Sequence, residues 1–519
     1  MLFNSLEFIF LFLPATLLGF FLLGRWRQDL AAAWLALASL AFYAWWSPTY
    51  VLLLLGSITF NYFFGLRIAH ATSHRHTWLI VAIAANLVAL CYFKYANFFV
   101  DNVDALLGLD WQIAAVILPL GISFFTFTQI AFLADTYQGK AKEYNPIHYV
   151  LFVTYFPHLI AGPVLHHKQM MPQFGWPQTY SVSSTNIAIG LTIFAIGLFK
   201  KVVLADGIAV YVSPVFSAAE HGKTLTIVEA WGGALTYTFQ LYFDFSGYSD
   251  MAIGLSRLFN IKLPLNFDSP YKAANIIDFW RRWHMTLSQF LRDYLYIALG
   301  GNRNGVVRRY INLALTMLLG GLWHGAGWTF VIWGGLHGVY LIINHLWRGL
   351  RQKYWGDAKP SRLGCYASLG LTFVAVVVGW VFFRSANFST ALSIVKSMFG
   401  GNGIMLPTAL GAGLGNELQS NCAAWGISFG DVGSLFKRPV EAFWIAGSLA
   451  FVWLLPNTQE IMRDYEPALA SGLERSKRPQ WWEMLTWKPH QYWALVTAMT
   501  LAWGILGISR VSEFLYFQF

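Results

Sequence analysis

Histidines are the residues of this sequence whose positions most favour chemistry. Residues 310–347 contain no Asp, Glu, Lys or Arg, yet they hold His324, His337 and His345. His324 follows Arg309 by fifteen residues, which corresponds to about 22 Å along a helix. An ionisable side chain that deep in an apolar segment normally faces a cavity and is a functional candidate. A neutral imidazole there can accept a proton from a hydroxyl and return it to a leaving group.

The alternative for these histidines is a structural role. A neutral imidazole can hydrogen-bond a backbone carbonyl and help two helices to pack. The run Gly320-Gly321-Leu322-Trp323-His324-Gly325 favours the functional interpretation for His324, because small residues let helices approach closely and an indole can wall a dry pocket. His337 and His345 are better explained by packing or by contacts at the membrane interface.

A second candidate, His284, lies in an amphipathic segment, residues 276–299. At about 100° per residue, the aromatic and aliphatic side chains fall mostly on one face and the charged ones on the opposite face. This pattern predicts a helix that lies in the membrane interface. His284 falls at the edge of the apolar face and is expected to point into the protein. The alternative is an interfacial histidine that only anchors the helix beside Trp283.

The rest of the sequence offers little other chemistry. Asp244 and Asp250 lie amid apolar residues, and we expect them to pair with arginines of residues 281–292 or to mark the end of a span. The three cysteines form no CxxC, so neither a disulfide framework nor a thiolate metal site is implied. The motifs H-x4-D and H-E-x-x-H and a phosphate-binding glycine loop are absent. Any catalysis must therefore come from the histidines.

The elements that position these histidines are membrane helices. Hydrophobic residues make up 56% of the chain and charged residues 12%, about half the charged share of a soluble domain. Apolar stretches long enough to cross about 30 Å of hydrocarbon recur from end to end, without the alternation of a membrane barrel. We therefore expect an all-α, polytopic integral membrane protein with about 11 to 13 membrane helices plus interfacial and re-entrant ones.

The predicted spans lie near 6–23, 29–46, 49–66, 78–93, 111–134, 146–165, 186–204, 229–254, 310–346, 366–383, 440–455 and 491–508. The run 310–346 is too long for one crossing. It is expected to form a re-entrant pair that breaks at Gly325-Ala326-Gly327.

The distribution of charge predicts how the chain is oriented. The net charge is +10, but Lys and Arg lie in short connections, where they act as cytoplasmic anchors and do not indicate nucleic-acid binding. Arg25 and Arg27 follow the first span, which predicts an external N-terminus. Residues 397–436 lack Lys and Arg and suit the external face, whereas the basic connection 456–490 suits the cytoplasm. Both termini are therefore predicted to be periplasmic.

Several blocks of the sequence resemble the membrane-bound O-acyltransferase family, in the bacterial branch of the alginate O-acetylation and teichoic acid D-alanyl transfer membrane proteins. The residues that carry the resemblance are FWRRWHMTLS at 279–288, RDYLY at 292–296, LGGNR at 299–303 and GGLWHG at 320–325. Further agreeing blocks lie at 42–46, 92–98, 118–124, 156–163 and 514–519. The connections 397–436 and 456–490 match none of the family's motifs.

The resemblance implies one membrane-embedded acyltransferase domain over residues 1–519, with a catalytic core at about 90–350. A tunnel in this core would bring a cytoplasmic acyl donor to a buried histidine. By this likeness His324 takes the place of the family's active-site histidine and His284 that of the second polar residue. His324 would act as a general base, or alternatively as a covalent acyl carrier, and His284 would orient the acceptor or help to stabilise the oxyanion.

The expected function is transfer of an acetyl group from acetyl-CoA across a bacterial inner membrane, for O-acetylation of an exported polysaccharide such as alginate. The expected partners are membrane lipid, a periplasmic acetyltransferase and the polysaccharide synthesis and export complex. No nucleic acid, metal or bound cofactor is expected. The alternatives are a transporter or flippase, a scaffold subunit of the export complex, and a D-alanyl-transferring member of the family.

Overall fold

The computed structural model describes residues 1–519 apart from 109–110, 112–114, 142–143, 161, 357–360, 431–438, 470–478, 509–514 and 516–519. Most of the described chain is helical. Two short strands, β1 (Ile404–Pro407) and β2 (Ile427–Gly430), form one parallel pair. The expected all-α fold class is therefore confirmed.

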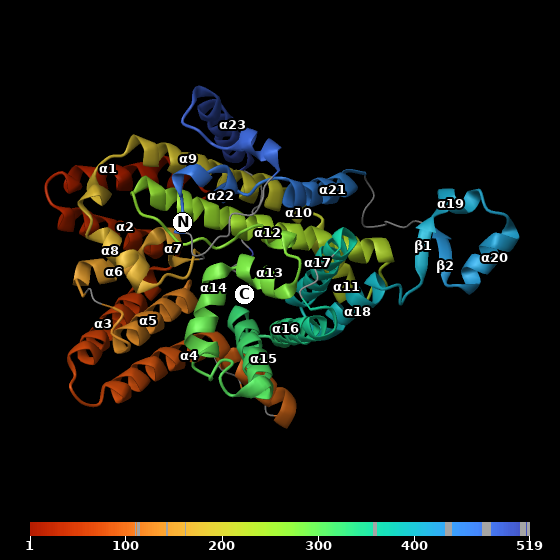
Figure 1. Ribbon diagram of the computed structural model, residues 1–519, viewed down its shortest axis with the longest axis horizontal. Coiled ribbons are helices and arrows are strands. Elements are labelled where there is room, and N and C mark those ends of the chain that lie inside the picture. The colour runs from red at the N-terminus through yellow and green to blue at the C-terminus, as the bar shows by residue number, and fades with distance from the viewer. Residues whose placement is uncertain are drawn as a thin grey trace.

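The N-terminal elements gather at one end of the molecule (Figure 1, red to orange). Their apolar side chains share one core cluster, in which Phe3, Phe8, Phe42 and Phe156 pack ring against ring. The elements are η1 (Phe8–Phe12), α1 (Leu13–Gly24), α2 (Gln28–Trp46), α3 (Pro48–His70), α4 (Arg75–Leu107), α5 (Ile122–Tyr137), α6 (Pro146–Thr154), α7 (Phe156–Leu159), α8 (His167–Phe174) and η2 (Pro177–Tyr180).

Two long helical segments cross the middle of the molecule and pack along each other (Figure 1). The first is α9 (Ser184–Phe199), which continues through the π-helix η3 (Lys200–Ala205) into α10 (Asp206–Ala209). The second is α12 (Ile227–Leu258), and α11 (Val212–Glu220) connects the two. Thr226 and Glu229 form a capping box that starts α12 by satisfying its first free N–H groups.

The C-terminal half continues beside this pair, and β1, β2, α19 and α20 form a unit that protrudes from the helices (Figure 1). The elements are η4 (Pro270–Lys272), α13 (Ile276–Arg282), α14 (Met285–Phe290), η5 (Leu291–Tyr296), α15 (Gly305–His324), α16 (Trp328–Trp355), α17 (Arg362–Arg384), α18 (Phe388–Met398), α19 (Thr408–Ala412), α20 (Asn416–Ala424), α21 (Pro439–Leu454), α22 (Thr458–Ile461), η6 (Arg463–Tyr465), η7 (Gln480–Leu485) and α23 (Gln491–Gly507).

Several helices are suited to a membrane. In the described part of the chain, six are long and apolar enough to cross one: α2, α3, α4, α16, α17 and the continuous segment 184–209. The segments 8–24 and 440–454 are apolar but shorter. The chain is thus a multi-pass membrane protein, as the composition predicted.

Three of the predicted segments differ from the structure in ways that concern the site. Helix α4 runs from Arg75 to Leu107 and not only over 78–93, so that Lys94 lies inside it. The segment 146–165 is broken after α6, where Pro157 follows. The segment 276–299 is not one helix but three short pieces, α13, α14 and η5.

The carboxylates of α12 are paired with lysines, not with arginines. Lys200 Nζ lies 2.6 Å from Asp250 Oδ2, and Lys201 Nζ lies 2.7 Å from both Asp206 Oδ1 and Asp244 Oδ1. The structural pairing expected for Asp244 and Asp250 is therefore present, but the expected arginine partners are wrong. The sequence could not reveal this pairing, because it depends on α9 and η3 lying against α12.

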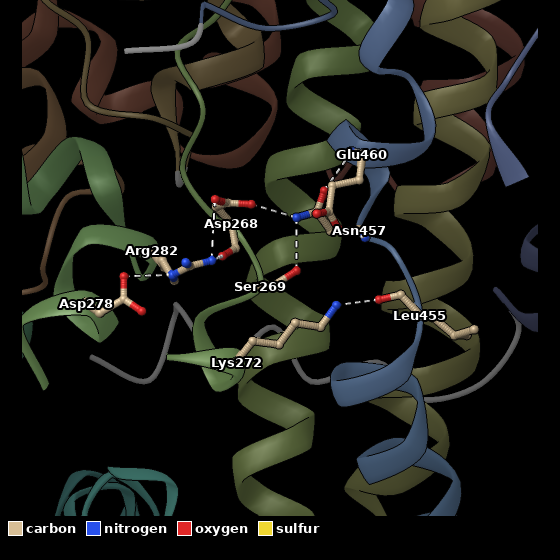
Figure 2. A network of polar contacts seen from close by, with 8 residues as sticks. All are labelled: Asp268, Ser269, Lys272, Asp278, Arg282, Leu455, Asn457 and Glu460. Carbon is tan, nitrogen blue, oxygen red and sulfur yellow. Dashed lines mark hydrogen bonds and ion pairs between the residues drawn. The ribbon is translucent and has the colours of Figure 1, made fainter. Parts of the chain in front are cut away.

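Asp268 and Lys272 instead bind the chain beyond α21, and Arg282 lies beside Asp268 (Figure 2). Arg282 lies between Asp278 and Asp268, with N···O distances of 3.0 and 3.7 Å. Asn457 donates to Asp268 Oδ1 over 2.8 Å, and Lys272 donates to the Leu455 carbonyl over 2.6 Å. These contacts fix the segment that carries His284 against the start of the connection 456–490.

Candidate functional site

His324 lies at a break between two antiparallel helices. Helix α15 ends at His324 and α16 begins at Trp328, with extended backbone at Gly325 and Gly327. The predicted break at Gly325-Ala326-Gly327 is confirmed. The hairpin is tight because a Cβ at Gly321 would overlap the Phe330 carbonyl oxygen, which agrees with the close approach that small residues allow.

Two side chains of α4 donate hydrogen bonds to the last backbone carbonyl groups of α15. Lys94 Nζ donates to the carbonyl oxygen of Trp323 and, over 3.4 Å, to that of His324. Tyr95 Oη donates to the Leu322 carbonyl over 2.8 Å. The last carbonyls of a helix have no partner within the helix and carry a partial negative charge, so an ammonium group is favourable there. Lys94 therefore fixes the backbone from which the imidazole of His324 projects.

We expect Lys94→Met to reduce acyl transfer at least tenfold, since a hydrogen bond from a charged donor contributes about 1.5–3 kcal/mol and about 1.4 kcal/mol corresponds to tenfold in rate. Lys94→Arg keeps a cationic donor and should retain more of the rate. The measurement is the transfer rate of purified variants in lipid, with Lys353→Met, at an exposed lysine, as the control. A wild-type rate in Lys94→Met would show that this contact does not position His324.

His284 lies at the break between α13 and α14. Its side chain is fully buried, and its backbone has φ 43° and ψ 53°. This left-handed conformation costs a residue other than glycine about 1–3 kcal/mol and is typical of functional sites. The backbone carbonyl of Asn266 accepts the Met285 N–H over 2.9 Å, and its side-chain Oδ1 lies 3.0 Å from His284 Nδ1. Asn266, which lies outside these two helices, thus stabilises the break between α13 and α14.

The structure brings His284 and His324 to one indole ring. The ring centroid of Trp323 lies 6.2 Å from that of His284 and 4.9 Å from that of His324. Phe245 packs edge-on against His284 at 4.8 Å, and Trp333 packs edge-on against His324 at 5.1 Å. His284 is fully buried, whereas His324 is partly exposed. The pair predicted from the sequence therefore shares one aromatic surrounding.

Several buried nitrogen atoms around this pair have no hydrogen-bond partner among the described residues. They are His284 Nε2, both ring nitrogens of His337, and the indole nitrogens of Trp280, Trp323 and Trp333. Buried polar groups of folded proteins are nearly always hydrogen-bonded, and exceptions are often found where a residue has a catalytic role or contacts water or an ion. Indole N–H groups can donate to a carbonyl oxygen, which is what an acyl group presents.

His337 and His345 lie on α16 but differ in their surroundings. His337 is fully buried, with Trp333 at 4.8 Å and Trp280 at 5.2 Å between ring centroids. His345 lies two turns further on and is partly exposed. The packing expected for His337 is observed. Both of its ring nitrogens are nevertheless among the buried nitrogen atoms that have no partner in the described part of the chain.

A cavity of about 260 Å³ lies beside η5 and the end of α5. Tyr294 Oη donates to Asp135 Oδ1 over 3.0 Å and lies 3.2 Å from His166 Nδ1. Burial lowers the pKa of His166, and the carboxylate of Asp135 opposes this shift. The other lining residues are Gln138, Lys140, Lys168, Asp293 and Ile297.

A row of aromatic rings joins this cavity to the histidine pair. The centroid of Phe290 lies 5.0 Å from that of Tyr294 and 4.4 Å from that of Phe127, and Phe127 stacks on Trp323 at 5.4 Å. Among the described residues, no three His, Cys, Asp or Glu side chains gather as metal ligands. The site thus offers two imidazoles that can take up and release a proton beside one aromatic cluster.

Comparison with known proteins identifies the family of this chain. The family model described as MBOAT, membrane-bound O-acyltransferase family, matches residues 66–384. The chain belongs to the membrane-bound O-acyltransferase family. The matched range includes Lys94, Asn266, His284 and His324, and the membership makes the chain an O-acyltransferase.

The relatives of this O-acyltransferase are named for different acceptors. It is 47% identical to the peptidoglycan O-acetyltransferase of Helicobacter pylori over 78% of the chain and 81% of that protein. It is 44% identical to the probable alginate O-acetylase AlgI of Pseudomonas aeruginosa over 77% of the chain and 75% of that protein. The teichoic acid D-alanyltransferase of Bacillus subtilis is 29% identical over 52% of the chain and 69% of that protein.

Sequence reasoning missed three residues of the site. Lys94 was seen only as part of the block 92–98, although a lysine inside an apolar helix is itself a signal. Asn266 gave no signal, because its role depends on its contact with His284. Trp333 lies nine residues beyond His324 and meets it only because α15 and α16 fold back on each other.

Proposed function

We propose that this O-acyltransferase takes an acetyl group from acetyl-CoA at the cytoplasmic face of a bacterial inner membrane and passes it across for O-acetylation of an exported polysaccharide such as alginate. The observation that carries the proposal is the meeting of His284 and His324 at Trp323. A buried acyl group needs a proton acceptor and hydrogen-bond donors for its oxygen, and both are present there. The printed names of the O-acetylase relatives support acetyl as the acyl group.

The proposed reaction needs no group other than these residues and two substrates. The oxygen of the acceptor hydroxyl forms a bond to the thioester carbonyl carbon while an imidazole takes its proton. The carbon–sulfur bond then breaks, and the proton passes to the thiolate. His284 and His324 are the proposed catalytic residues, within a proposed core of about 90–350. A His324 that carries the acetyl group covalently is the alternative pathway.

The orientation is part of the proposal. Basic connections such as 347–364 are proposed to face the cytoplasm, and 397–436, which lacks Lys and Arg, to face the periplasm with both termini. The residues of β1, β2, α19 and α20 lie in that external segment. Trp425 is its one tryptophan, which gives little stacking surface for a sugar polymer.

This composition leads us to propose that the chain is a relay, which hands the acetyl group to a periplasmic acetyltransferase. We expect purified protein in sealed vesicles, given acetyl-CoA at the basic face and polymer at the other, to form no polymer ester. Addition of the periplasmic partner should start ester formation. The control is acetyl-CoA at the opposite face only. Efficient acetylation of the polymer by this chain alone would contradict the relay.

A second polymer is a candidate acceptor of the acetyl group. The Helicobacter pylori relative is named a peptidoglycan O-acetyltransferase and is more similar in sequence than the AlgI protein cited above. Peptidoglycan is therefore the alternative acceptor, and the same vesicle assay with each polymer and its partner distinguishes the two.

A further inference from the structure

One face of α20, in the unit that protrudes from the helices, is apolar and exposed. Leu418, Cys422 and Trp425 follow one another at spacings of four and three residues, so they lie on the same side of the helix. Trp425, at the end of α20, is 84% exposed, and Leu418 is exposed as well. Exposed apolar side chains that gather on one face mark a surface that binds another molecule.

The opposite side of α20 is bound within the protruding unit. The side-chain nitrogen of Gln419 donates to the carbonyl oxygens of Gly411 and Leu414 over 2.7 and 3.1 Å. Phe429 of β2 packs on Gly411 so closely that a Cβ there would lie 2.6 Å from its ring. Helix α20 thus turns a polar side inward and its apolar side outward, the reverse of a surface helix in a soluble domain.

Lipid is not suited to cover this face. Residues 397–436 contain Glu417 and Asp431 but no Lys or Arg, whereas helices on membrane surfaces use Lys and Arg to bind anionic lipid. Ile404 donates to the Gly426 carbonyl over 2.8 Å, so alternate residues such as Ile427 direct their backbone groups away from the strand pair. Hydrocarbon cannot satisfy such groups, which keeps the unit out of the bilayer.

The same charges disfavour two other occupants. A uronate polymer such as alginate is anionic, and like charges repel. In a two-fold dimer formed through α20 the two acidic segments would face each other, because such an interface uses the same patch twice. The occupant that fits is a protein outside the membrane, with an apolar groove and a neutral or basic rim.

We propose that the face formed by Leu418, Cys422 and Trp425 is the docking site of the periplasmic acetyltransferase that receives the acetyl group. The assignment rests on the proposed relay. Trp425 enters an apolar groove of the partner, as a helix face commonly does in protein recognition, and Glu417 lies beside the groove's neutral or basic rim. The unit protrudes from the helices (Figure 1), so the partner reaches it without entering the membrane.

The first test measures how much partner is needed for half-maximal ester formation in vesicles given acetyl-CoA and polymer. Trp425→Ala and Leu418→Glu should each raise this concentration about tenfold or more, since a few anchor residues carry most of the binding energy of an interface. The rate at saturating partner should stay near that of the wild type, because the unit lies outside the histidine site.

A matched control uses a tryptophan of similar exposure elsewhere. Trp26, between α1 and α2, is 81% exposed, and Trp26→Ala should leave the required partner concentration unchanged. If Trp425→Ala and Leu418→Glu also leave it unchanged, the docking site is wrong. It is equally wrong if both variants lower the rate at saturating partner without a change in the concentration needed, because that is the result of damage to the fold.

The second test identifies the occupant directly. Cys422 lies within the proposed face, and with Cys91 and Cys365 replaced by alanine it can carry a single bimane fluorophore. We expect the emission to change when the periplasmic acetyltransferase is added without acetyl-CoA. Quenching by lipids brominated in their tails, a change with polymer alone, or a change with the concentration of the chain alone would overturn the proposal in favour of lipid, polymer or a second copy.

The two proposals fail separately in these experiments. A bimane response to the partner with no ester formed would contradict the proposed acetyl transfer and leave the docking site standing. Ester formation at a normal partner concentration in Trp425→Ala would contradict the docking site and leave the proposed transfer standing.

Discussion

His324→Ala is expected to reduce acetyl ester on the exported polysaccharide to background in cells that depend on this chain. Loss of a positioned base or of a donor to the oxyanion costs about 100-fold or more in rate. His324 supplies one of these functions at the end of α15, where Lys94 holds its carbonyl. The measurement is the ester content of the polymer, normalised to the amount of protein inserted in the membrane.

A conservative replacement separates this account from its rivals. A transporter or scaffold predicts that His324→Gln leaves the ester unchanged, because the amide fills a similar volume. The catalytic account predicts a large loss in His324→Gln as well. His345→Gln is the control, since His345 is partly exposed and lies outside the aromatic surrounding of the pair. A well-inserted His324→Ala variant with normal ester would contradict the assignment.

Lys201→Met is expected to have the largest effect on stability. Lys201 is 1% exposed and lies 2.7 Å from both Asp206 and Asp244. Removal of one partner from a buried ion pair leaves an uncompensated charge and costs about 3–5 kcal/mol. We expect the variant to show a clearly lower unfolding temperature in detergent and less inserted protein than the wild type.

Two further variants test the cause of that loss. Lys201→Met combined with Asp244→Asn removes one of the charges left behind and should recover part of the stability. Arg27→Met breaks the exposed Arg27–Asp29 pair at 3.6 Å and should change stability by no more than about 1 kcal/mol. If Lys201→Met is as stable as Arg27→Met, the buried pairs do not stabilise the fold.

The features predicted correctly are those that a local pattern determines. The uncharged run 310–347 could be recognised as too long for one crossing, and its glycines identified the break after His324. The composition was sufficient for the helical, multi-pass fold. Each of these features depends on residues adjacent in sequence, so periodicity and composition were enough.

The features that were missed depend on contacts between distant segments. The periodicity of 276–299 predicted one helix, but Asn266 binds Met285 and His284 and so opens the chain there. The lysine partners of Asp244 and Asp250 come from η3, fifty residues away in one case. The spacing of residues within one segment does not predict these contacts. Tertiary hydrogen bonds form between segments and can override the structure that the local pattern favours.

The most direct test of the proposed function is the acetyl ester content of the exported polysaccharide in a strain that lacks only this chain. We expect the ester to fall to background and to return when the wild-type chain is supplied, whereas the amount of polymer stays the same. Normal ester in the deletion strain, with polymer still exported, would contradict the claim that this O-acyltransferase supplies the acetyl group. Loss of the polymer itself would instead favour a transporter or a scaffold.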